Sequence, residues 1–266
     1  MKISFITLFP DIIQSYISTG LLARAQANTL FEFEVFNIRD AVTKNYKSAD
    51  DTVYGGSDGM LIQYDPLVQT LNKVQRDPTA EVIYLSPQGQ NLNQNLINKL
   101  KVKKHLILIS GRYAGVDQRF IKEHVDLELS IGDYVLCGGE LPSLVLVETI
   151  SRQVSGVLGS HESAQNDSFT QGLLEAPQFT KPNEVSGMKV PEVLVSGDHK
   201  KIELWKNHMS VLVTLKKRED LILPKVNEIN WKQIDAFYKN VSQEDKNILQ
   251  INDLDQKIEK YKNGTP

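Results

Sequence analysis

The stretch from Ser130 to Glu148 reads SIGDYVLCGGELPSLVLVE, a glycine-punctuated segment followed by a nearly continuous apolar run. Gly132, Gly138 and Gly139 bracket the residues DYVLC. Glycine adopts positive φ angles and allows other atoms to approach the backbone closely. Two interpretations follow: the segment is either a loop that wraps around a ligand or a sharp turn in a crowded core.

The first 155 residues of the chain alternate between two kinds of segment. Short segments rich in β-branched and aromatic residues have the length of strands, and the segments between them have helical apolar spacing. This alternation predicts an α/β fold with a mostly parallel sheet covered on both faces. The expected strands are KISFITL (2–8), FEFEVFNI (31–38), EVIYLS (81–86), HLILIS (105–110) and DLELSI (126–131), and the expected helices are 11–28, 65–77, 91–102 and 115–124.

Two other stretches interrupt this pattern. VYGGSDGM (53–60) contains three glycines and is predicted to be a mobile loop. GVLGSHESAQNDSFTQG (156–172) has the composition of a linker. The following segments 198–220, 231–240 and 244–261 have helical patterns. We therefore expect an α/β domain over residues 1–160, a flexible linker over 161–175 and a small helical domain over 176–266.

The composition narrows the class of protein. Cys137 is the single cysteine, which excludes an intrachain disulfide and a multi-cysteine zinc site. No apolar run reaches about 18 residues, so no membrane partner is expected. The N-terminus lacks the pattern of a signal peptide, and a cytoplasmic protein is expected. The formal net charge is −3, yet residues 181–218 hold eight basic and four acidic side chains. That basic stretch either binds phosphates or is a solvated helix face.

Glycine-containing turns follow three of the expected strands, in PQGQ, GRYAG and GDYVLCGG. Ligands of open α/β sheets bind outside the carboxyl ends of the strands. Three such turns can form one concave site in which backbone N–H and C=O groups bind the edge of a purine. The alternative is that the glycines serve only the turns, because strand-to-helix turns need glycine in any case. The sequence contains no G-x-G-x-x-G, P-loop, H-E-x-x-H or G-x-S-x-G motif. By elimination, the site suits an adenosine-type ligand without a phosphate chain, and no metal site is expected.

A series of motifs resembles the TrmD family, the bacterial tRNA (guanine-N1)-methyltransferases of the SPOUT class. The resemblance extends from the N-terminus to about Leu221, with similar spacing throughout. The motifs are LFP (8–10), YGG (54–56), YLSPQGQ (84–90), GRYAGVDQR (111–119), SIGDYVLCGGELP (130–142), RQVSGVLG (152–159), DSF (167–169), GLLEAPQFTKP (172–182) and GMKVPEVLVSGDHKKIELW (187–205).

The resemblance implies a SPOUT-type parallel sheet with a C-terminal trefoil knot, followed by a small all-helical C-terminal domain. It also implies a homodimer with active sites across the interface, and the apolar helix after Gly139 resembles the dimer-forming helix. The three turns are then the loops that hold S-adenosylmethionine in a bent shape. The residues that the resemblance assigns to this cofactor are Tyr84, Leu85, Ser86, Pro87, Gly89, Gly111, Arg112, Tyr113, Gly115, Ile131, Gly132, Asp133, Tyr134, Val135, Leu136, Gly138 and Gly139.

The reaction implied is methyl transfer to N1 of the guanosine at tRNA position 37, next to the anticodon. Asp167, from the partner's linker, matches the general base that removes the N1 proton, and its alternative role is a helix N-cap. Arg152 matches the arginine that stabilises charge on the guanine oxygen, and its alternative is an ion pair with Glu148. The tRNA anticodon arm is the implied partner, with contacts at Gly56, Gly59, Ser168, Ser196 and Lys200.

The chain departs from the family pattern at two places. Ala114 stands where the motif usually has glutamate, and Ser57 and Asp58 alter the usual GGGPGM loop. These differences leave the magnesium requirement open. They also leave two alternatives to an active enzyme, a slowed or non-catalytic RNA-binding relative and a SPOUT methyltransferase that acts on another RNA site.

Overall fold

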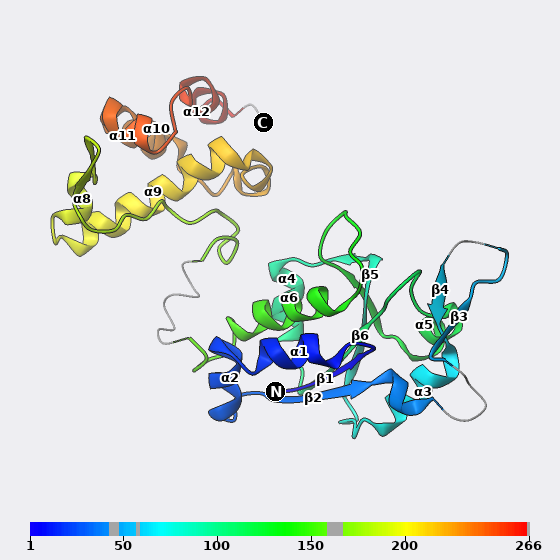
Figure 1. Cartoon of the computed structure of the whole chain (residues 1–266). Coiled ribbons are helices and arrows are strands. Elements are labelled where there is room, and N and C mark those ends of the chain that lie inside the picture. Colours follow the sequence, from blue (N-terminus) through cyan, green and yellow to red (C-terminus); the bar gives the residue numbers. More distant parts are fainter. Residues whose placement is uncertain (43–47, 57–58, 159–166, 265–266) are drawn as a thin grey trace. The chain divides into compact units, whose positions relative to one another are not determined.

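A computed structural model describes residues 1–42, 48–56, 59–158 and 167–264 of the chain (Figure 1). The chain divides into two compact units, residues 1–161 and 162–266, and each is described by itself. Ser57 and Asp58 lie outside the described residues, as do positions 161–166 of the predicted linker. The three-part division expected from the sequence therefore stays a prediction.

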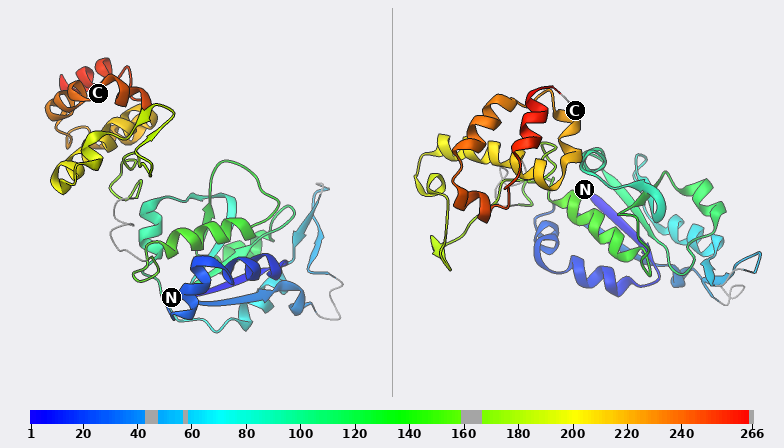
Figure 2. Two further views of the ribbon diagram at one scale, coloured as in Figure 1. Left: turned by 60° about the vertical axis from the view of Figure 1, so that its left-hand side comes forward. Right: turned by 90° about the horizontal axis from the view of Figure 1, so that it is seen from above.

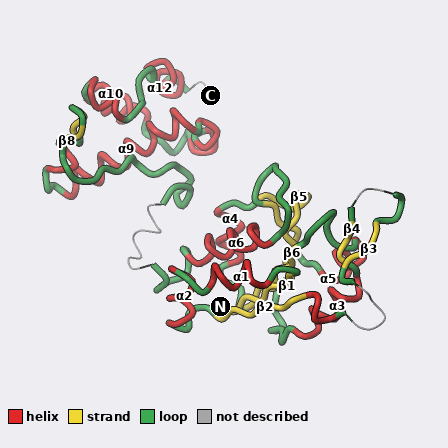
Figure 3. The backbone as a smooth tube through the Cα atoms, viewed as in Figure 1, coloured by secondary structure: helices red, strands yellow, loops and turns green. Residues whose placement is uncertain are grey.

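Five strands form a parallel sheet in the first unit, as the sequence pattern predicts (Figure 3). Their order across the sheet is β2-β1-β6-β5-β7, so the chain crosses over between sequential strands. The central strand β6 is buried along its whole length, which explains the apolar run over residues 106–109. The strands are β1 (Lys2–Thr7), β2 (Glu32–Asn37), β5 (Glu81–Asn91), β6 (His105–Ser110) and β7 (Leu127–Ser130). The predicted trefoil knot remains a prediction.

Helices cover both faces of this sheet, and alternate strand residues point to opposite faces. Ile3 and Phe5 of β1 belong to one apolar cluster, and Ile6 belongs to the other. The first cluster contains side chains of α1 (Pro10–Ile17), α2 (Gly20–Ala27), α4 (Gln94–Leu100) and α6 (Glu140–Ser151). The second contains side chains of η1 (Ile38–Ala41), α3 (Tyr64–Lys73) and α5 (Gln118–His124).

One expectation for the first unit is wrong, and one pair of strands in it was not expected. The helix predicted over 11–28 is two helices, α1 and α2, because Thr19 is extended and Gly20 has a φ of 61°. The loop predicted over 53–60 is flanked by a two-stranded antiparallel ribbon, β3 (Asp50–Thr52) and β4 (Met60–Ile62). Strands of three residues are too short to show the alternation of apolar and polar residues that the sequence pattern detects.

The PQGQ segment is a third difference, because it is not a strand-to-helix turn. Strand β5 continues to Asn91, and Leu85 and Gln90 both lie opposite Leu129 of β7. The residues between them therefore bulge out of the β5–β7 ladder. This bulge displaces Ser86 and Pro87 from the sheet while leaving the strand on either side paired.

The second unit is built around the long helix α9 (His199–Lys217), along which the later helices pack (Figure 2). The helix expected over 244–261 is interrupted, since Gln250 and Asp253 have positive φ angles. The remaining elements are β8 (Glu184–Val185), β9 (Met188–Lys189), α8 (Glu192–Val195), η2 (Glu219–Leu221), η3 (Leu223–Lys225), α10 (Trp231–Asn240), α11 (Gln243–Ile248) and α12 (Asp255–Lys262). In the described parts of both units, no helix has the length and apolarity to cross a bilayer.

A polar network lies among the strands β1, β2 and β6 and includes the buried His105. Asp77 N–H lies 3.4 Å from His105 Nδ1, and Nε2 lies 2.9 Å from Ser4 Oγ. Ser4 in turn donates to Glu34 Oε2 over 2.9 Å. This chain of donors is satisfied when the imidazole is neutral with its proton on Nε2. Burial, followed by the charge of Lys2, lowers the pKa of His105 below its ordinary 6.5.

Acidification is expected to destabilise the first unit through His105. Because its pKa is lowered by folding, the unfolded chain binds the proton more readily, and stability is fully present only above pH 6.5. The melting temperature should fall as the pH is lowered from 6.5 towards the folded-state pKa. Thermal melts of the wild type and His105→Gln between pH 7.5 and 5.5 test this. If the melting temperature falls equally steeply with pH in both proteins, His105 is not the group responsible.

Candidate functional site

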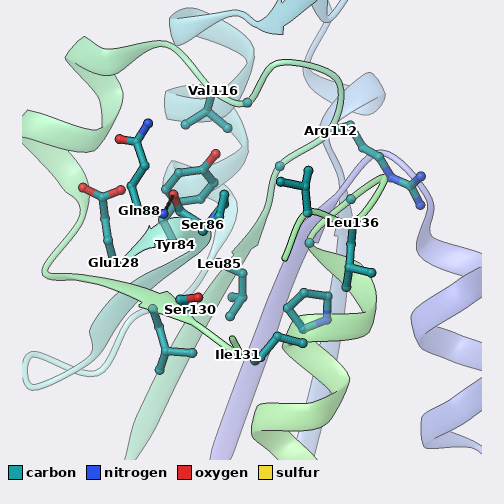
Figure 4. Close-up of a pocket in the computed structure, with 18 of the residues that line it drawn as sticks. Tyr84, Leu85, Ser86, Gln88, Arg112, Val116, Glu128, Ser130, Ile131 and Leu136 are labelled. Carbon is teal, nitrogen blue, oxygen red and sulfur yellow. Dashed lines mark hydrogen bonds between the residues drawn. The ribbon is translucent and has the colours of Figure 1, made fainter. Parts of the chain in front are cut away.

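A cavity of about 340 Å³ opens where the ends of β5, β6 and β7 meet (Figure 4). Three separate segments line it: the β5 bulge, the loop after β6, and the stretch from β7 to the start of α6. The lining includes most of the residues assigned to the cofactor, namely Tyr84, Leu85, Ser86, Pro87, Gly111, Arg112, Tyr113, Gly115, Ile131, Gly132, Tyr134, Val135, Leu136, Gly138 and Gly139. The tertiary structure thus gathers segments that are spread over residues 84–142 of the sequence.

Two assigned residues, Gly89 and Asp133, are not part of the described lining. Gly89 instead packs against β7, where a Cβ atom would lie 2.3 Å from the nitrogen of Leu129. The lining also contains side chains that the resemblance did not assign to the cofactor, including Gln88, Gln118, Glu128, Ser130, Cys137 and Pro142, and of these Glu128 lies outside the quoted motifs. The signal for Glu128 and Ser130 is present in the sequence, because polar residues are unusual in a strand of a parallel sheet.

A buried ion pair joins two of the lining segments. Arg112 Nε lies 2.8 Å from Glu140 Oε2, and Thr7 Oγ1 donates to Glu140 Oε1 over 2.7 Å. The Glu140 side chain is 1% exposed and that of Arg112 is 19% exposed. Backbone contacts accompany the pair, because Gly139 N–H donates to the Gly111 carbonyl over 2.8 Å and Arg112 bridges to Gly138. The loop after β6 and the loop before α6 are therefore held as one structure.

Gly139→Ala is expected to disrupt this junction. An added Cβ would lie 2.7 Å from the Cα atom of Ser110 and 2.9 Å from the nitrogen of Gly111, and neither backbone atom moves freely. Overpacking of this kind costs about 1–3 kcal/mol. Calorimetric unfolding should show that loss, together with weaker ligand binding. Val102→Ala, at an exposed position, should change the stability by less than about 0.5 kcal/mol. A Gly139→Ala protein with wild-type stability would contradict the close packing of Gly139 against Ser110 and Gly111.

The loop after β6 also contacts the β3–β4 ribbon. Ala114 N–H donates to the Met60 carbonyl over 3.0 Å, and Ile62 forms a bridge with Val116. Ala114 itself lines the cavity. Tyr84 forms a buried part of the lining, and burial is the main cause that raises the pKa of its phenol. The Tyr84 phenol is therefore a neutral part of the lining at pH 7.

The proposed catalytic residues belong to different units. Arg152 is the C-cap of α6, and its N–H lies 3.3 Å from the Glu148 carbonyl. Asp167 lies in a turn of the second unit, where its carbonyl accepts from Thr170 N–H over 3.2 Å. The helix N-cap considered for Asp167 is not found, since no described helix begins there. The pairing of Arg152 and Asp167 in one site stays a prediction.

The residues expected to contact tRNA are spread over several elements. Gly56 and Gly59 belong to the connection between β3 and β4, and both have positive φ angles. Ser168 Oγ accepts from Glu175 N–H over 2.9 Å. Ser196 is the C-cap of α8, and Lys200 lies in the first turn of α9. Across the described ranges, no group of three or more His, Cys, Asp or Glu side chains converges as a metal site. The magnesium requirement stays open.

Comparison with known proteins gives the same family over most of the chain. The family model described as tRNA (Guanine-1)-methyltransferase TrmD matches residues 1–224. A tRNA (guanine-N(1)-)-methyltransferase of Shewanella denitrificans is 45% identical over 223 residues, which cover 83% of this chain and 90% of the relative. The protein of that name from Fervidobacterium nodosum is 40% identical over 243 residues, covering 91% of this chain and 98% of the relative.

These matches include all three segments that line the cavity, because residues 84–142 fall within the matched range. The parallel sheet that positions the segments is also contained in that range. The chain belongs to the TrmD family of tRNA (guanine-1)-methyltransferases.

Proposed function

We propose that this protein transfers a methyl group from S-adenosylmethionine to N1 of a guanosine in tRNA, at position 37 next to the anticodon. The observation that carries the proposal is the cavity formed by three segments that all lie within the family match. Nothing favours a non-catalytic relative or another RNA site. A cytoplasmic location is part of the same proposal.

The cavity fits the cofactor in its chemistry. Its lining combines apolar side chains, such as Leu85 and Leu136, with glycine-rich backbone that leaves polar groups accessible to a purine. Its volume of about 340 Å³ lies within the range of small-molecule sites. When bound there, S-adenosylmethionine supplies a methyl group on a positively charged sulfur.

The roles of the chain's own residues follow from the guanine. Neutral guanine carries a proton on N1, so a base has to remove that proton before the nitrogen can attack a methyl carbon. We assign this role to the Asp167 carboxylate. Arg152 stabilises the negative charge that develops on the guanine oxygen. The N1–C bond forms as the C–S bond breaks, the proton passes to Asp167, and the sulfur leaves as an uncharged thioether.

A homodimer is the second part of the proposal. Leu141 is 58% exposed and Val145 is 40% exposed, and a separation of four residues places them on one face of α6. Exposed apolar side chains on an otherwise buried helix are typical of an interface. We propose that this face meets a second copy and that Asp167 of one protomer serves the cavity of its partner. Sedimentation of the full chain tests this, and a monomer at micromolar concentration would contradict it.

Mapping of the methylated base tests the proposed reaction. The full-length protein is incubated with labelled S-adenosylmethionine and a tRNA transcript that has guanosine at position 37, and the labelled nucleoside is identified by mass spectrometry. The expected product is 1-methylguanosine at that position. A transcript with adenosine at position 37 is the control. Label at another base would overturn the assigned site, and tRNA binding without any label would indicate the non-catalytic alternative.

A further inference from the structure

The charge that lines the cavity is unbalanced. Within the described residues, Arg112 and Glu128 are the two charged side chains of the lining. Arg112 is already engaged, because its Nε lies 2.8 Å from Glu140 and its guanidinium carbon lies 4.3 Å from the centre of the Phe9 ring. Figure 4 shows Arg112 on the opposite side of the cavity from Glu128. Glu128 therefore gives the cavity a net negative charge.

The position of Glu128 is set by the strands. It lies on β7 directly opposite Tyr84 of β5, and its side chain lies beside Gln88 and Tyr84 (Figure 4). Its backbone is tightly packed, since a Cβ atom on Gly89 would lie 2.4 Å from the Glu128 carbonyl carbon. The negative charge of Glu128 also contributes, after burial, to the raised pKa of Tyr84. A carboxylate held this way presents its charge to any ligand in the cavity.

We propose that Glu128 recognises the positive charge of the methyl donor and thereby selects a cationic nucleoside over an uncharged one. This inference rests on the proposed function. S-adenosylmethionine carries a sulfonium and, at its amino-acid end, an ammonium beside a carboxylate, whereas its adenosine part is neutral. The backbone groups of the lining can read the adenosine but do not distinguish a charged from an uncharged substituent. A carboxylate does so, because it attracts a cationic substituent and does not attract an uncharged one.

The consequence for the reaction is a preference between donor and product. Methyl transfer turns the sulfonium into an uncharged thioether, while the ammonium is unchanged. If Glu128 acts on the sulfonium, its attraction ends once the methyl group has left, and the product is released more readily than the donor. If it acts on the ammonium, donor and product are attracted equally.

Calorimetric titration of the full-length protein tests the inference with three probes. They are S-adenosylmethionine, S-adenosylhomocysteine and 5′-methylthioadenosine, which has the adenosine and thioether but no charged group. Glu128→Gln keeps the shape of the side chain and removes its charge. It should weaken binding of S-adenosylmethionine about tenfold and change that of 5′-methylthioadenosine less than about twofold. Glu32→Gln is the matched control, because Glu32 lies on β2 at the opposite edge of the sheet.

Each result has a defined meaning. If Glu128→Gln loses as much affinity for S-adenosylhomocysteine as for the donor, Glu128 contacts the ammonium. If it loses affinity for the donor alone, Glu128 contacts the sulfonium. If Glu128→Gln loses equal affinity for the donor and for 5′-methylthioadenosine, or loses affinity for neither, the proposed role of Glu128 is overturned. Glu128→Asp, which keeps the charge, should recover part of the donor affinity. A wild-type protein that binds none of the probes would instead overturn the proposed function.

Discussion

Asp167→Asn is expected to lower kcat for tRNA methylation by about 10²–10⁴-fold, the usual contribution of a positioned general base. The amide has nearly the same shape as the carboxylate but cannot accept the N1 proton of guanine. Affinity for S-adenosylmethionine should be unchanged, because Asp167 is not part of the described cavity lining. Single-turnover rates with saturating tRNA measure the chemical step, and calorimetry measures the cofactor affinity.

A second acidic residue in the same segment provides a control, which separates the role of Asp167 as a base from the loss of a negative charge. Glu175→Gln removes one negative charge eight residues from Asp167, and the Glu175 side chain is in contact with Gln178. This variant should retain the wild-type rate. An Asp167→Asn enzyme that keeps more than about a third of the wild-type rate would exclude general-base catalysis by this residue. If both variants lose the same fraction of the single-turnover rate, the negative charge of the segment matters, rather than proton removal by Asp167.

Glu140→Ala is expected to destabilise the first unit by about 3–5 kcal/mol, the range for breaking a buried ion pair. The variant leaves the Arg112 guanidinium without its carboxylate partner, although only 19% of that side chain is exposed. It also removes the acceptor of the Thr7 hydroxyl. Both tryptophans, Trp205 and Trp231, lie in the second unit, so urea unfolding has to be followed by far-UV circular dichroism rather than tryptophan fluorescence.

An exposed ion pair on the sheet of the same unit is the control for Glu140. Glu32 lies 3.6 Å from Lys2 with 66% of its side chain exposed, and Glu32→Ala should change the stability by less than about 1 kcal/mol. The double variant Arg112→Ala/Glu140→Ala should be less destabilised than the sum of the two single variants, since it leaves no buried charge unpaired. Additive effects would contradict a direct interaction between the two side chains.

The fold was predictable where a local pattern carries it. The β6 strand is apolar over residues 106–109 because both its faces are covered, and α10 matches the predicted range 231–240. The break at Gly20 and the interruption of the last helices at Gln250 and Asp253 were missed. Helical spacing continues across both breaks, and it does not reveal that a residue inside it adopts an extended or left-handed backbone.

The motifs in the sequence located the loops of the candidate site, but they did not predict which side chains contact one another there. The motifs identified the backbone loops around Gly111 and Gly132 that line the cavity. They did not indicate that Glu140, a charged residue at the start of an apolar helix, is buried against Arg112. They also did not indicate that Glu128 lines the cavity. An acid in a buried strand or helix is visible in the sequence, but its partner is not.

By itself, the sequence determined the class of fold, the five strands of the parallel sheet and the family, because apolar periodicity and motif spacing are local properties of the chain. Only the tertiary structure decided that Leu85 and Gln90 share one partner across a bulge, and that Glu128 and Arg112 lie on opposite sides of one cavity. The physical reason is that such proximity depends on strand order and register. Both are set by packing between segments far apart in the chain.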